Sequence, residues 1–476
     1  MPAMKNTSRL ANLSFSSLSL LALAGALSLT ALACEESSGP DGSSGGIDGG
    51  GSDTDAGACS TEGTGTITIA ITGLPDDVAP KGKITGPSGS AVDVTAAATL
   101  ADQAAGTYSV TAERVAKPDP IVRTLYEPTV SSSEFCLEGT KTQTVTIAYA
   151  EVGSSNKLWG ANANADGQLI AYAGADLAAT GSPAAKVKTK GASGQGAHAG
   201  RAVAFDKDGN LWGIGATTVD APILRFSASD LGASGDKTPD RKINPALSTC
   251  SPGFTSLAFD PSGALWTTST CSDQILRIAP DTLSASKDYT PVADDIVSGI
   301  DEPHALAFDK DGNLWVSGKD TLHRFSAASL APGQPHTSDF ALSVKAADAP
   351  LPPGALAFDK DGNLWVMNFG GNAIFKLTPA ELAPDGASKE VAPAISIAIE
   401  VSALLESMAF DESGGLWLTY AAGQVARLAP DQLGTSSTSG SETVPQTLIT
   451  SPDIGGLKSL AFYPAPANLP LYGRFE

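Results

Sequence analysis

Hydrophobic and polar residues alternate along three short stretches between residues 59 and 152, at 66–71, 106–112 and 144–149. In the first stretch, isoleucine alternates with threonine and alanine. A period of two places successive side chains on opposite faces of a strand, so each stretch is predicted to be a half-buried β-strand. Antiparallel strands separated by Gly- and Pro-containing turns predict a small β-sandwich over residues 59–152.

The rest of the chain, residues 153–476, repeats one hydrophobic pattern. The six tryptophans each follow a leucine, at spacings of 49 to 54 residues: Trp159, Trp212, Trp266, Trp315, Trp365 and Trp417. Six Ala-Phe pairs recur at a similar period and end at Phe205, Phe259, Phe308, Phe358, Phe410 and Phe462. Two further apolar stretches complete a unit of four short strands joined by Gly-rich turns. Such units are typical of propeller blades, so the pattern predicts an all-β chain with a six-bladed β-propeller.

The two series are offset at the ends of this region. The region begins with the pair Leu158-Trp159, which no Ala-Phe pair precedes, and it ends with Ala461-Phe462, which no Leu-Trp pair follows. The last strand is therefore predicted to complete the first blade. Pairing the two ends of the region closes the ring and leaves no strand edge open.

The tryptophans and the charged turns both have a structural and a functional interpretation. A tryptophan at one register in every blade is typical of the core between blades rather than of a binding site. The turn Asp309-Lys310-Asp311-Gly312-Asn313 and its copies resemble part of a calcium loop. They lack the further spaced ligands and the later glutamate of such a loop, so we interpret them as hairpin turns with glycine at positive φ.

The repeat resembles known propeller families. Residues 302–316 are similar to NHL repeats and to the blades of streptogramin lyases and of the regucalcin/gluconolactonase family. Their sequence is Glu-Pro-His-Ala-Leu-Ala-Phe-Asp-Lys-Asp-Gly-Asn-Leu-Trp-Val. The likeness covers residues 153–476. WD-repeat and kelch propellers fit less well, because their Gly-His/Trp-Asp and double-Gly patterns are missing. The segment 59–152 resembles, in composition, immunoglobulin-like accessory modules of exported bacterial proteins.

In both enzyme families, the functional residue stands about four positions before the phenylalanine. The resemblance therefore implies a site at the mouth of the central channel. The corresponding residues here are Arg201, Thr255, His304, Gly354, Glu406 and Lys458. These positions vary and are mostly polar, whereas the positions that follow are small or apolar in every copy, as expected for a shaped pocket above a uniform core.

The resemblance implies a catalytic role for two of these residues. His304 matches the histidine of the lyase Pro-His-Gly repeat and is a candidate general base, and Glu406 matches the metal-binding aspartate of the gluconolactonases. Both patterns are incomplete, since Gly354 replaces an asparagine ligand and the first glutamate ligand and the second lyase histidine are missing. Arg201 and Lys458 would repel a divalent cation. The favoured interpretation is a non-catalytic binding rim of Arg201, Thr255, His304, Glu406 and Lys458, with no cofactor and no metal; a divalent cation belongs only to the enzymatic alternative.

The N-terminus resembles a bacterial lipoprotein signal. Residues 1–33 contain a basic start, an apolar run too short for a comfortable transmembrane helix, and Ala31-Leu32-Ala33 before Cys34. The resemblance implies lipidation of Cys34, and Glu35 implies transfer to the outer membrane. Residues 34–58 contain almost no apolar residue and are predicted to form a flexible Gly/Ser/Asp-rich tether.

The net charge indicates which binding partners to expect, and the cysteine content indicates the redox compartment. The formal net charge is −21, and removal of the signal with its Lys5 and Arg9 gives −23. Such a chain is not expected to bind nucleic acid; its expected partners are the membrane, through the lipid, and an unidentified protein or small molecule. Apart from Cys34 there are four cysteines, which suits an oxidising compartment; we pair Cys59 with Cys136 and Cys250 with Cys271, each within one predicted unit.

These observations predict a lipid-anchored binding or scaffolding protein. The enzymatic alternative is a gluconolactonase-like hydrolase or a streptogramin-lyase-like lyase that uses His304 and Glu406.

Overall fold

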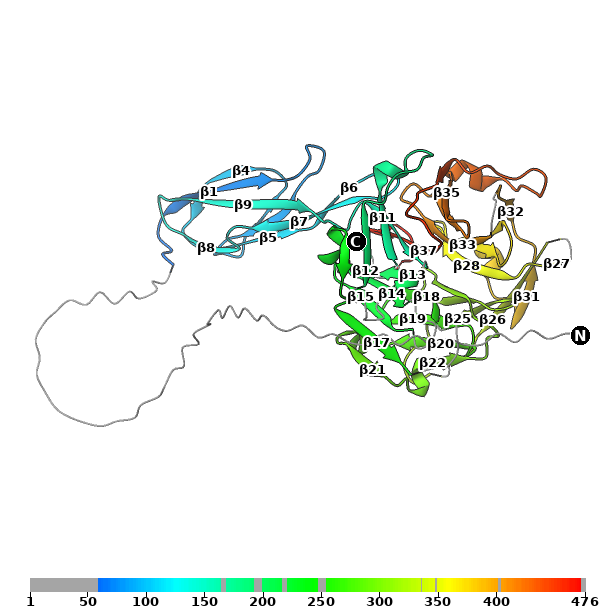
Figure 1. Ribbon diagram of the computed structural model, residues 1–476. Coiled ribbons are helices and arrows are strands. Elements are labelled where there is room, and N and C mark those ends of the chain that lie inside the picture. Colours follow the sequence, from blue (N-terminus) through cyan, green and yellow to red (C-terminus); the bar gives the residue numbers. More distant parts are fainter. Residues whose placement is uncertain are drawn as a thin grey trace, which may run out of the picture. The chain divides into compact units, whose positions relative to one another are not determined.

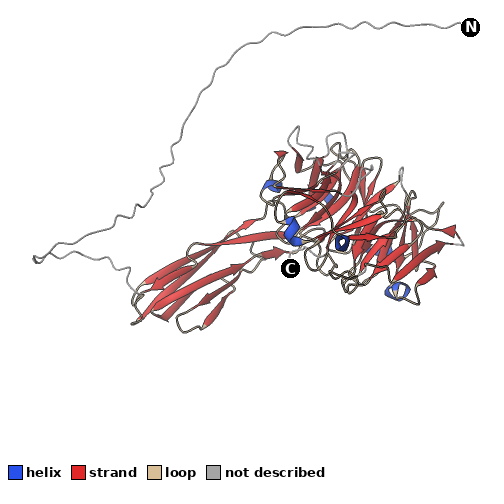
Figure 2. Ribbon diagram, turned by 90° about the horizontal axis from the view of Figure 1, so that it is seen from below, coloured by secondary structure: helices blue, strands red, loops and turns tan. Residues whose placement is uncertain are grey.

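The computed structural model describes residues 59–471, except 164–167, 192–198, 216–220, 247–253, 335, 347–348 and 401–403. β-Strands dominate this part of the chain, and its helices are only single turns, such as α1 (Pro280–Leu283) and α2 (Pro379–Leu382) (Figure 2). Among these residues, no helix has the length and apolar character needed to cross a membrane. The predicted signal peptide, the lipidated Cys34 and the tether lie outside the described residues and stay predictions.

Two sheets form the N-terminal part of the described chain, residues 64–151 (Figure 1). One has the strand order β4-β1-β9-β7-β6 and the other β3-β2-β5-β8. Their strands are β1 (Thr64–Thr72), β2 (Lys81–Thr85), β3 (Ala91–Val94), β4 (Ala98–Ala104), β5 (Gly106–Glu113), β6 (Val115–Lys117), β7 (Thr124–Val130), β8 (Glu134–Leu137) and β9 (Thr142–Glu151). Ile67 and Val145 of the first sheet share one hydrophobic core with Ile84 and Val110 of the second. The alternating pattern therefore yields two sheets with their apolar faces together, as in a sandwich.

The expectation of purely antiparallel strands in this region is wrong for one pair. β1 and β9 run parallel, from the pair Thr66–Thr142 to the pair Thr72–Ala148. They are the first and last strands of the region, so no tight hairpin joins them and their direction is not fixed by a turn. The immunoglobulin-like assignment stays a prediction.

The predicted disulfide within this region is confirmed. Cys59 is bonded to Cys136, with 5.5 Å between their Cα atoms. The bond connects the start of the region to β8, in the second sheet. Cys250 lies outside the described residues, so the pair Cys250–Cys271 stays a prediction.

Six sheets of the described residues form the β-propeller (Figure 1). Sheet 1 contains β10 (Lys157–Asn162), β11 (Gln168–Ala173), β12 (Val187–Gly191), β16 (Gly235–Lys237) and β37 (Leu457–Tyr463). Sheet 2 contains β13 (Ala199–Phe205), β14 (Leu211–Gly215), β15 (Ile223–Phe226), β17 (Arg241–Pro245) and β21 (Lys287–Tyr289). Sheet 3 contains β18 (Phe254–Phe259), β19 (Leu265–Ser269), β20 (Gln274–Ile278) and β22 (Ile296–Ser298).

The remaining three sheets follow the same order. Sheet 4 contains β23 (Ala305–Phe308), β24 (Leu314–Ser317), β25 (Leu322–Phe325), β26 (Phe340–Ala346), β27 (Ala349–Pro350) and β31 (Ser388–Val391). Sheet 5 contains β28 (Pro353–Phe358), β29 (Leu364–Asn368), β30 (Ala373–Leu377) and β32 (Ile395–Ala398). Sheet 6 contains β33 (Leu405–Phe410), β34 (Leu416–Tyr420), β35 (Gln424–Leu428) and β36 (Thr447–Ile449).

The strand that carries the Ala-Phe pair is the inner strand of each sheet. The inner strands contact one another in the order β37, β13, β18, β23, β28 and β33, and β33 contacts β37 again. β37 enters sheet 1 by pairing antiparallel with β10, the pairing that the offset of the two series predicts. The inner strands therefore surround a central channel, and the two ends of the repeat region lie in the same sheet.

The charged turns are hairpins, as the sequence predicts. The Oδ1 atom of Asp309 accepts hydrogen bonds from the backbone N–H groups of Asp311 and Asn313, at 3.0 and 2.9 Å. Its Oδ2 atom accepts one from the indole N–H of Trp315 at 3.2 Å, and Gly312 has a φ of 79°. Both oxygens are thus occupied by the turn itself. Over the described ranges, no group of three or more His, Cys, Asp or Glu side chains could hold a metal ion.

The tryptophans belong to the core between sheets. The ring of Trp266 in sheet 3 packs edge-to-face against Phe308 in sheet 4, with 6.0 Å between ring centroids. The same contact, at 6.1 to 6.3 Å, joins the pairs Trp159–Phe205, Trp212–Phe259, Trp365–Phe410 and Trp417–Phe462. Trp315 instead packs edge-to-face against Phe340 of its own sheet, at 6.3 Å. Five of the six tryptophans therefore pack against the phenylalanine of the neighbouring sheet, as expected for residues of the core between blades.

A partly buried ion pair connects the N-terminal sheets to the first turn of sheet 6 and to the segment that follows β37. Arg123, beside β7, lies 3.1 Å from Glu412 in the first turn of sheet 6. Arg123 also donates to the carbonyl of Ala465 at 2.5 Å, while Glu412 accepts from the N–H of Ala467 at 3.0 Å. The segment that follows β37 is thus held in place, and its residues line one end of the channel.

Candidate functional site

One cavity of about 840 Å³ occupies the channel. All six inner strands contribute to its wall, and so do the residues that follow β37. The six positions predicted from the repeat all line it: Arg201, Thr255, His304, Gly354, Glu406 and Lys458. Because each stands four residues before its phenylalanine, they surround the end of the channel away from the phenylalanines. The ring expected from the sequence is therefore assembled around a single space.

A β-bulge sets the direction of most of these side chains. In sheet 6, Leu405 pairs with Tyr420 and Ser407 with Thr419, so Glu406 is the extra residue between two paired ones. Register shifts fall at the corresponding positions in sheets 1, 2, 3 and 5. A bulge re-aims a side chain without breaking the sheet. In sheet 4 the residue is His304, which lies just before β23 and whose N–H donates to the carbonyl of Ser317 at 2.8 Å.

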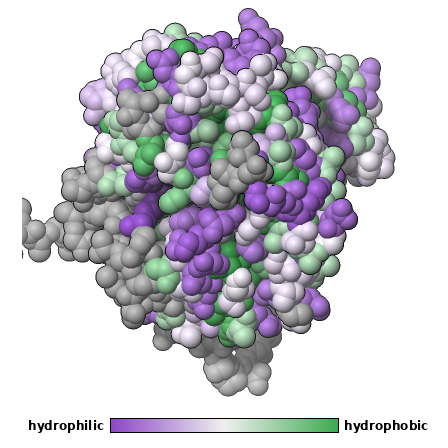
Figure 3. Space-filling model, turned by 90° about the vertical axis from the view of Figure 1, so that its right-hand side faces the viewer, coloured by the Kyte–Doolittle hydropathy of each residue, from purple (hydrophilic) through white to green (hydrophobic). Residues whose placement is uncertain are grey.

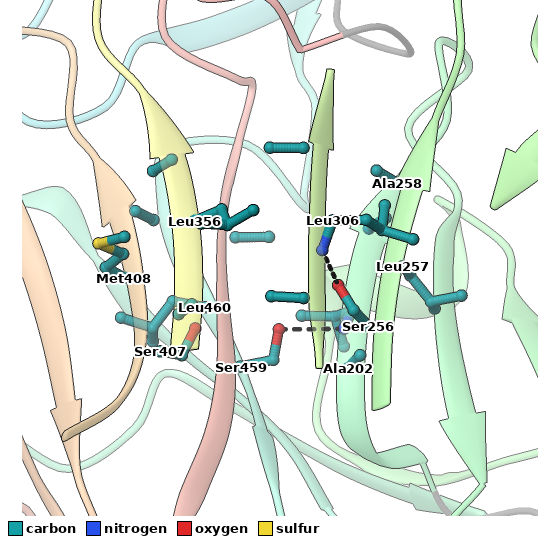
Figure 4. Close-up of a pocket in the computed structure, with 18 of the residues that line it drawn as sticks. Ala202, Ser256, Leu257, Ala258, Leu306, Leu356, Ser407, Met408, Ser459 and Leu460 are labelled. Carbon is teal, nitrogen blue, oxygen red and sulfur yellow. Dashed lines mark hydrogen bonds between the residues drawn. The ribbon is translucent and has the colours of Figure 1, made fainter. Parts of the chain in front are cut away.

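The wall below the ring is mostly apolar, with serines that satisfy backbone groups. Inner strands have one open edge, so their N–H groups on the channel side need another partner. The hydroxyl of Ser256 accepts from the N–H of Leu306 at 3.3 Å, and that of Ser459 accepts from Val203 at 3.2 Å (Figure 4). These bonds join neighbouring inner strands, and Leu356, Met408 and Leu460 supply apolar surface to the same cavity.

The charges of the ring are unequally paired. Lys458 Nζ lies 2.5 Å from Glu406 Oε1, so these two charges neutralise each other across neighbouring inner strands. Within the part of the chain that the structure describes, Arg201 has no hydrogen-bond or ion-pair partner. Partial burial lowers the pKa of Arg201, yet a guanidinium stays protonated at neutral pH. The ring therefore presents one positive charge that its own residues do not neutralise.

His304 is part of an aromatic stack. Its ring lies against Phe369, with 4.3 Å between centroids and an angle of 20° between the ring planes. Its backbone carbonyl accepts hydrogen bonds from the hydroxyls of Thr255 and Thr268, at 3.0 and 3.1 Å. Burial lowers the pKa of His304, and Glu302 only partly opposes this. The imidazole is therefore neutral at neutral pH and is held at the cavity by residues of sheet 3.

The structure does not join the two predicted catalytic residues. Glu406 pairs with Lys458, and the ring of His304 stacks on Phe369. Among the described residues, no hydrogen bond links His304 to Glu406, because their inner strands β23 and β33 are separated by β28 in the ring. Their catalytic assignment stays a prediction.

Sequence reasoning missed Phe369 and Thr268. Phe369 follows β29 in the Asn-Phe-Gly-Gly segment, outside the register of the repeat, and 56% of its surface is exposed. Comparing the six copies provides a signal, because the segments after the other Leu-Trp strands have no phenylalanine at this place. Only the closed ring, however, brings Phe369 beside His304.

The lowered pKa values of two histidines predict how the stability of the protein changes with pH. Burial lowers the pKa of both His304 and His323, whose Nε2 lies 2.8 Å from the hydroxyl of Thr321. As pH falls below the ordinary histidine value of about 6.5, the unfolded chain takes up protons before the folded protein does, so stability is lost. We expect the free energy of unfolding in urea to fall less between pH 7 and pH 5 in the double variant H304F/H323F than in the wild type. An equal fall in both proteins would contradict this account.

Comparisons with known proteins find distant similarity to solved structures and no similarity to a protein family. No protein-family model matches the chain, and neither does any curated protein. A streptogramin B lyase structure is similar at 14% identity, with 67% of this chain and 84% of that chain covered and a TM-score of 0.39. A catalytically inactive virginiamycin B lyase from Staphylococcus aureus with quinupristin is similar at 16% identity, covering 67% and 85%, with a TM-score of 0.35. A protein of unknown function from Bacteroides caccae is 10% identical, covering 64% and 98%, with a TM-score of 0.39. Likeness at this level carries no argument about function.

Proposed function

We propose that this protein is a lipid-anchored binding module of the bacterial outer membrane, whose propeller takes up a small molecule at the channel mouth. The single observation that carries the proposal is the cavity: six residues that differ from copy to copy surround one apolar space, and one of them, Arg201, is a cation without a partner among the described residues. A cavity of about 840 Å³ is within the range of small-molecule sites.

The surface supports a small ligand more than a protein partner. On the face seen in Figure 3, hydrophobic side chains form small separate areas between hydrophilic ones, leaving aside the atoms drawn in grey. Protein-binding surfaces are usually marked by larger continuous apolar patches. The channel wall, by contrast, gathers Leu306, Leu356 and Met408 around one space. We therefore favour binding in the channel over scaffolding by the outer surface.

The proposed location rests on the N-terminal sequence. Ala31-Leu32-Ala33-Cys34 fits a lipoprotein cleavage site, and a polar tether follows it. Metabolic labelling with an azide- or alkyne-bearing palmitate should label the wild type and leave the variant C34A unlabelled. Labelling of both proteins would contradict lipidation at Cys34.

The methionines provide a direct test of binding in the channel. The chain has four, of which Met1 and Met4 lie in the predicted signal; Met408 lines the cavity, and Met367 is buried in β29 and does not line it. With methyl-¹³C methionine, the NMR signal of Met408 is expected to shift when a neutral apolar probe such as 2-naphthamide is added, and that of Met367 to stay in place. The variant M408L assigns the signal.

The outcomes of this titration are distinct. A saturable shift of Met408 alone supports a ligand site in the channel. Equal shifts of both methionines indicate a general effect on the fold, and no shift at millimolar probe concentrations means that the channel does not take up small molecules. Either of the last two results would overturn the proposed function.

The enzymatic alternative is favoured by one observation, the position of His304 in the wall of the cavity, where burial lowers the pKa of its imidazole. A neutral imidazole can accept a proton, as a general base must. We expect no lactone hydrolysis above background by the purified protein, since no carboxylate orients the His304 ring among the described residues. Hydrolysis that is lost in both H304A and E406A would establish the enzyme and displace the binding proposal.

A further inference from the structure

We propose that the channel mouth selects planar aromatic monocarboxylates, with Arg201 binding the carboxylate and Phe369 stacking on the ring. This inference rests on the proposed function, because it names the ligand class of the same cavity. It is drawn from the charges, the aromatic surface and the shape of the mouth.

The positive charge of Arg201 at the channel mouth favours an anionic ligand. Lys458 and Glu406 neutralise each other at 2.5 Å, which leaves Arg201 as the ring charge without a partner among the described residues. Keeping a partly buried cation unpaired is costly, because it has lost part of its hydration. A guanidinium binds a carboxylate through two parallel N–H···O bonds, which restores the lost interactions. One guanidinium balances a single negative charge, so a monocarboxylate fits better than a phosphate monoester.

The exposed ring of Phe369 favours a ligand that contains a planar aromatic group. Phe369 lines the cavity, and 56% of its surface is exposed. Exposing an apolar ring to water does not stabilise the folded protein. One face of the Phe369 ring is supported by His304 at 4.3 Å, in a nearly parallel stack. The backbone of His304 is in turn fixed by hydroxyls of Thr255 and Thr268. A supported ring of this kind offers a second aromatic group a pre-formed stacking surface.

The shape of the mouth leaves room between these two features. In the ring of inner strands, β13 and β28 are three positions apart, so Arg201 and Gly354 lie on opposite sides of the channel. Gly354 has no side chain, and a Cβ there would meet the backbone of Met367 and Phe369 at 3.3 and 3.5 Å. With no side chain at this position, the segment that carries Phe369 packs closely against β28, on the side of the channel opposite Arg201. A flat ligand can therefore lie next to Phe369 with its carboxylate toward Arg201.

Three probes separate the contributions of charge and ring. 2-Naphthoate has both features, 2-naphthamide lacks the charge, and cyclohexanecarboxylate lacks the aromatic ring. Their affinities are measured from the shift of the Met408 methyl signal in the full chain. We expect 2-naphthoate to bind about tenfold or more tightly than 2-naphthamide, as a charge-assisted hydrogen bond would give. We also expect it to bind more tightly than cyclohexanecarboxylate.

Three variants assign these effects to residues. R201Q should remove the preference for 2-naphthoate over 2-naphthamide while 2-naphthamide still binds, which also shows that the variant is folded. K360Q removes one positive charge from an exposed turn near the other end of the channel, where Lys360 lies 3.6 Å from Asp361, and should keep the preference. F369L should weaken both naphthyl probes by about three- to tenfold and leave cyclohexanecarboxylate unchanged.

The results distinguish this inference from the function on which it rests. If 2-naphthamide and 2-naphthoate bind equally, or if K360Q loses the preference as R201Q does, the assignment to Arg201 is wrong although the cavity binds small molecules. If F369L binds all probes as the wild type does, the stacking role is wrong. If no probe shifts Met408, the proposed function itself fails.

Discussion

Replacing Asp411 with alanine is expected to destabilise the propeller by about 3–5 kcal/mol, because it leaves a buried cation without its partner. The side chain of Asp411 is 0% exposed and that of Arg427 is 11% exposed, with 2.6 Å between Oδ2 and Nε. The same carboxylate accepts from the indole of Trp417 at 2.9 Å and from the N–H of Gly415 at 2.7 Å. D411A therefore removes three interactions together: the hydrogen bond that holds the turn at Gly415, the hydrogen bond to Trp417 and the ion pair with Arg427. Urea unfolding followed by tryptophan fluorescence measures the loss.

The equivalent residue in sheet 5 is a matched control. Asp359 holds its turn through Asn363 and accepts from the indole of Trp365, at 2.9 and 3.0 Å. Within the described ranges it has no ion-pair partner, so D359A should cost less than D411A. The double variant D411A/R427L should recover part of the stability lost in D411A, because it removes the unpaired cation as well. Equal losses in D411A and D359A, without recovery in the double variant, would mean that the ion pair contributes nothing.

Removing the disulfide is expected to destabilise the N-terminal sheets by about 4 kcal/mol. Cys59 and Cys136 are separated by 77 residues, and a cross-link across so long a loop strongly restricts the unfolded chain. In the variant C59S/C136S the first strands should therefore open far more often. Hydrogen exchange resolved by mass spectrometry measures this opening in β1, β5 and β9.

The tryptophans make the disulfide experiment specific to the N-terminal sheets. All six lie in the propeller, between Trp159 and Trp417, so their fluorescence reports propeller unfolding alone. We expect faster exchange in the N-terminal strands of C59S/C136S with an unchanged tryptophan transition. A variant whose strands exchange as slowly as those of the wild type would show that the bond adds no stability.

Much of the fold could be read from the sequence because its determinants are local. The alternation in 66–71 predicts β1, and each Ala-Phe and Leu-Trp pair predicts two strands joined by an Asp-Gly turn. In the structure, Asp309 bonds within its own turn and to Trp315, six residues away. Contacts over such short distances along the chain follow from the order of the residues alone. The parallel pairing of β1 with β9 was missed, because no short turn connects these strands.

The sequence predicts which positions form the candidate site, but not how their side chains are paired or oriented. The repeat register selects Arg201, His304 and Lys458, but it does not say which of the ring residues pair. The bulges decide where the side chains point, and they follow from how two strands align rather than from either strand alone. The pairing of Glu406 with Lys458 joins residues 52 positions apart in the chain. The two candidate catalytic residues make separate contacts in the structure, Glu406 with Lys458 and His304 with Phe369.

Local sequence patterns predict the strands, the hairpins and the ring positions that the structure contains, while the lipoprotein signal at the N-terminus stays a prediction. The tertiary structure alone decided which ring charge lacks a partner and which aromatic side chain lies beside it. The physical reason is the range of the interactions. Strand alternation and turn hydrogen bonds act between near neighbours, whereas the isolation of Arg201 and the stacking of Phe369 on His304 arise only when distant strands meet around one channel.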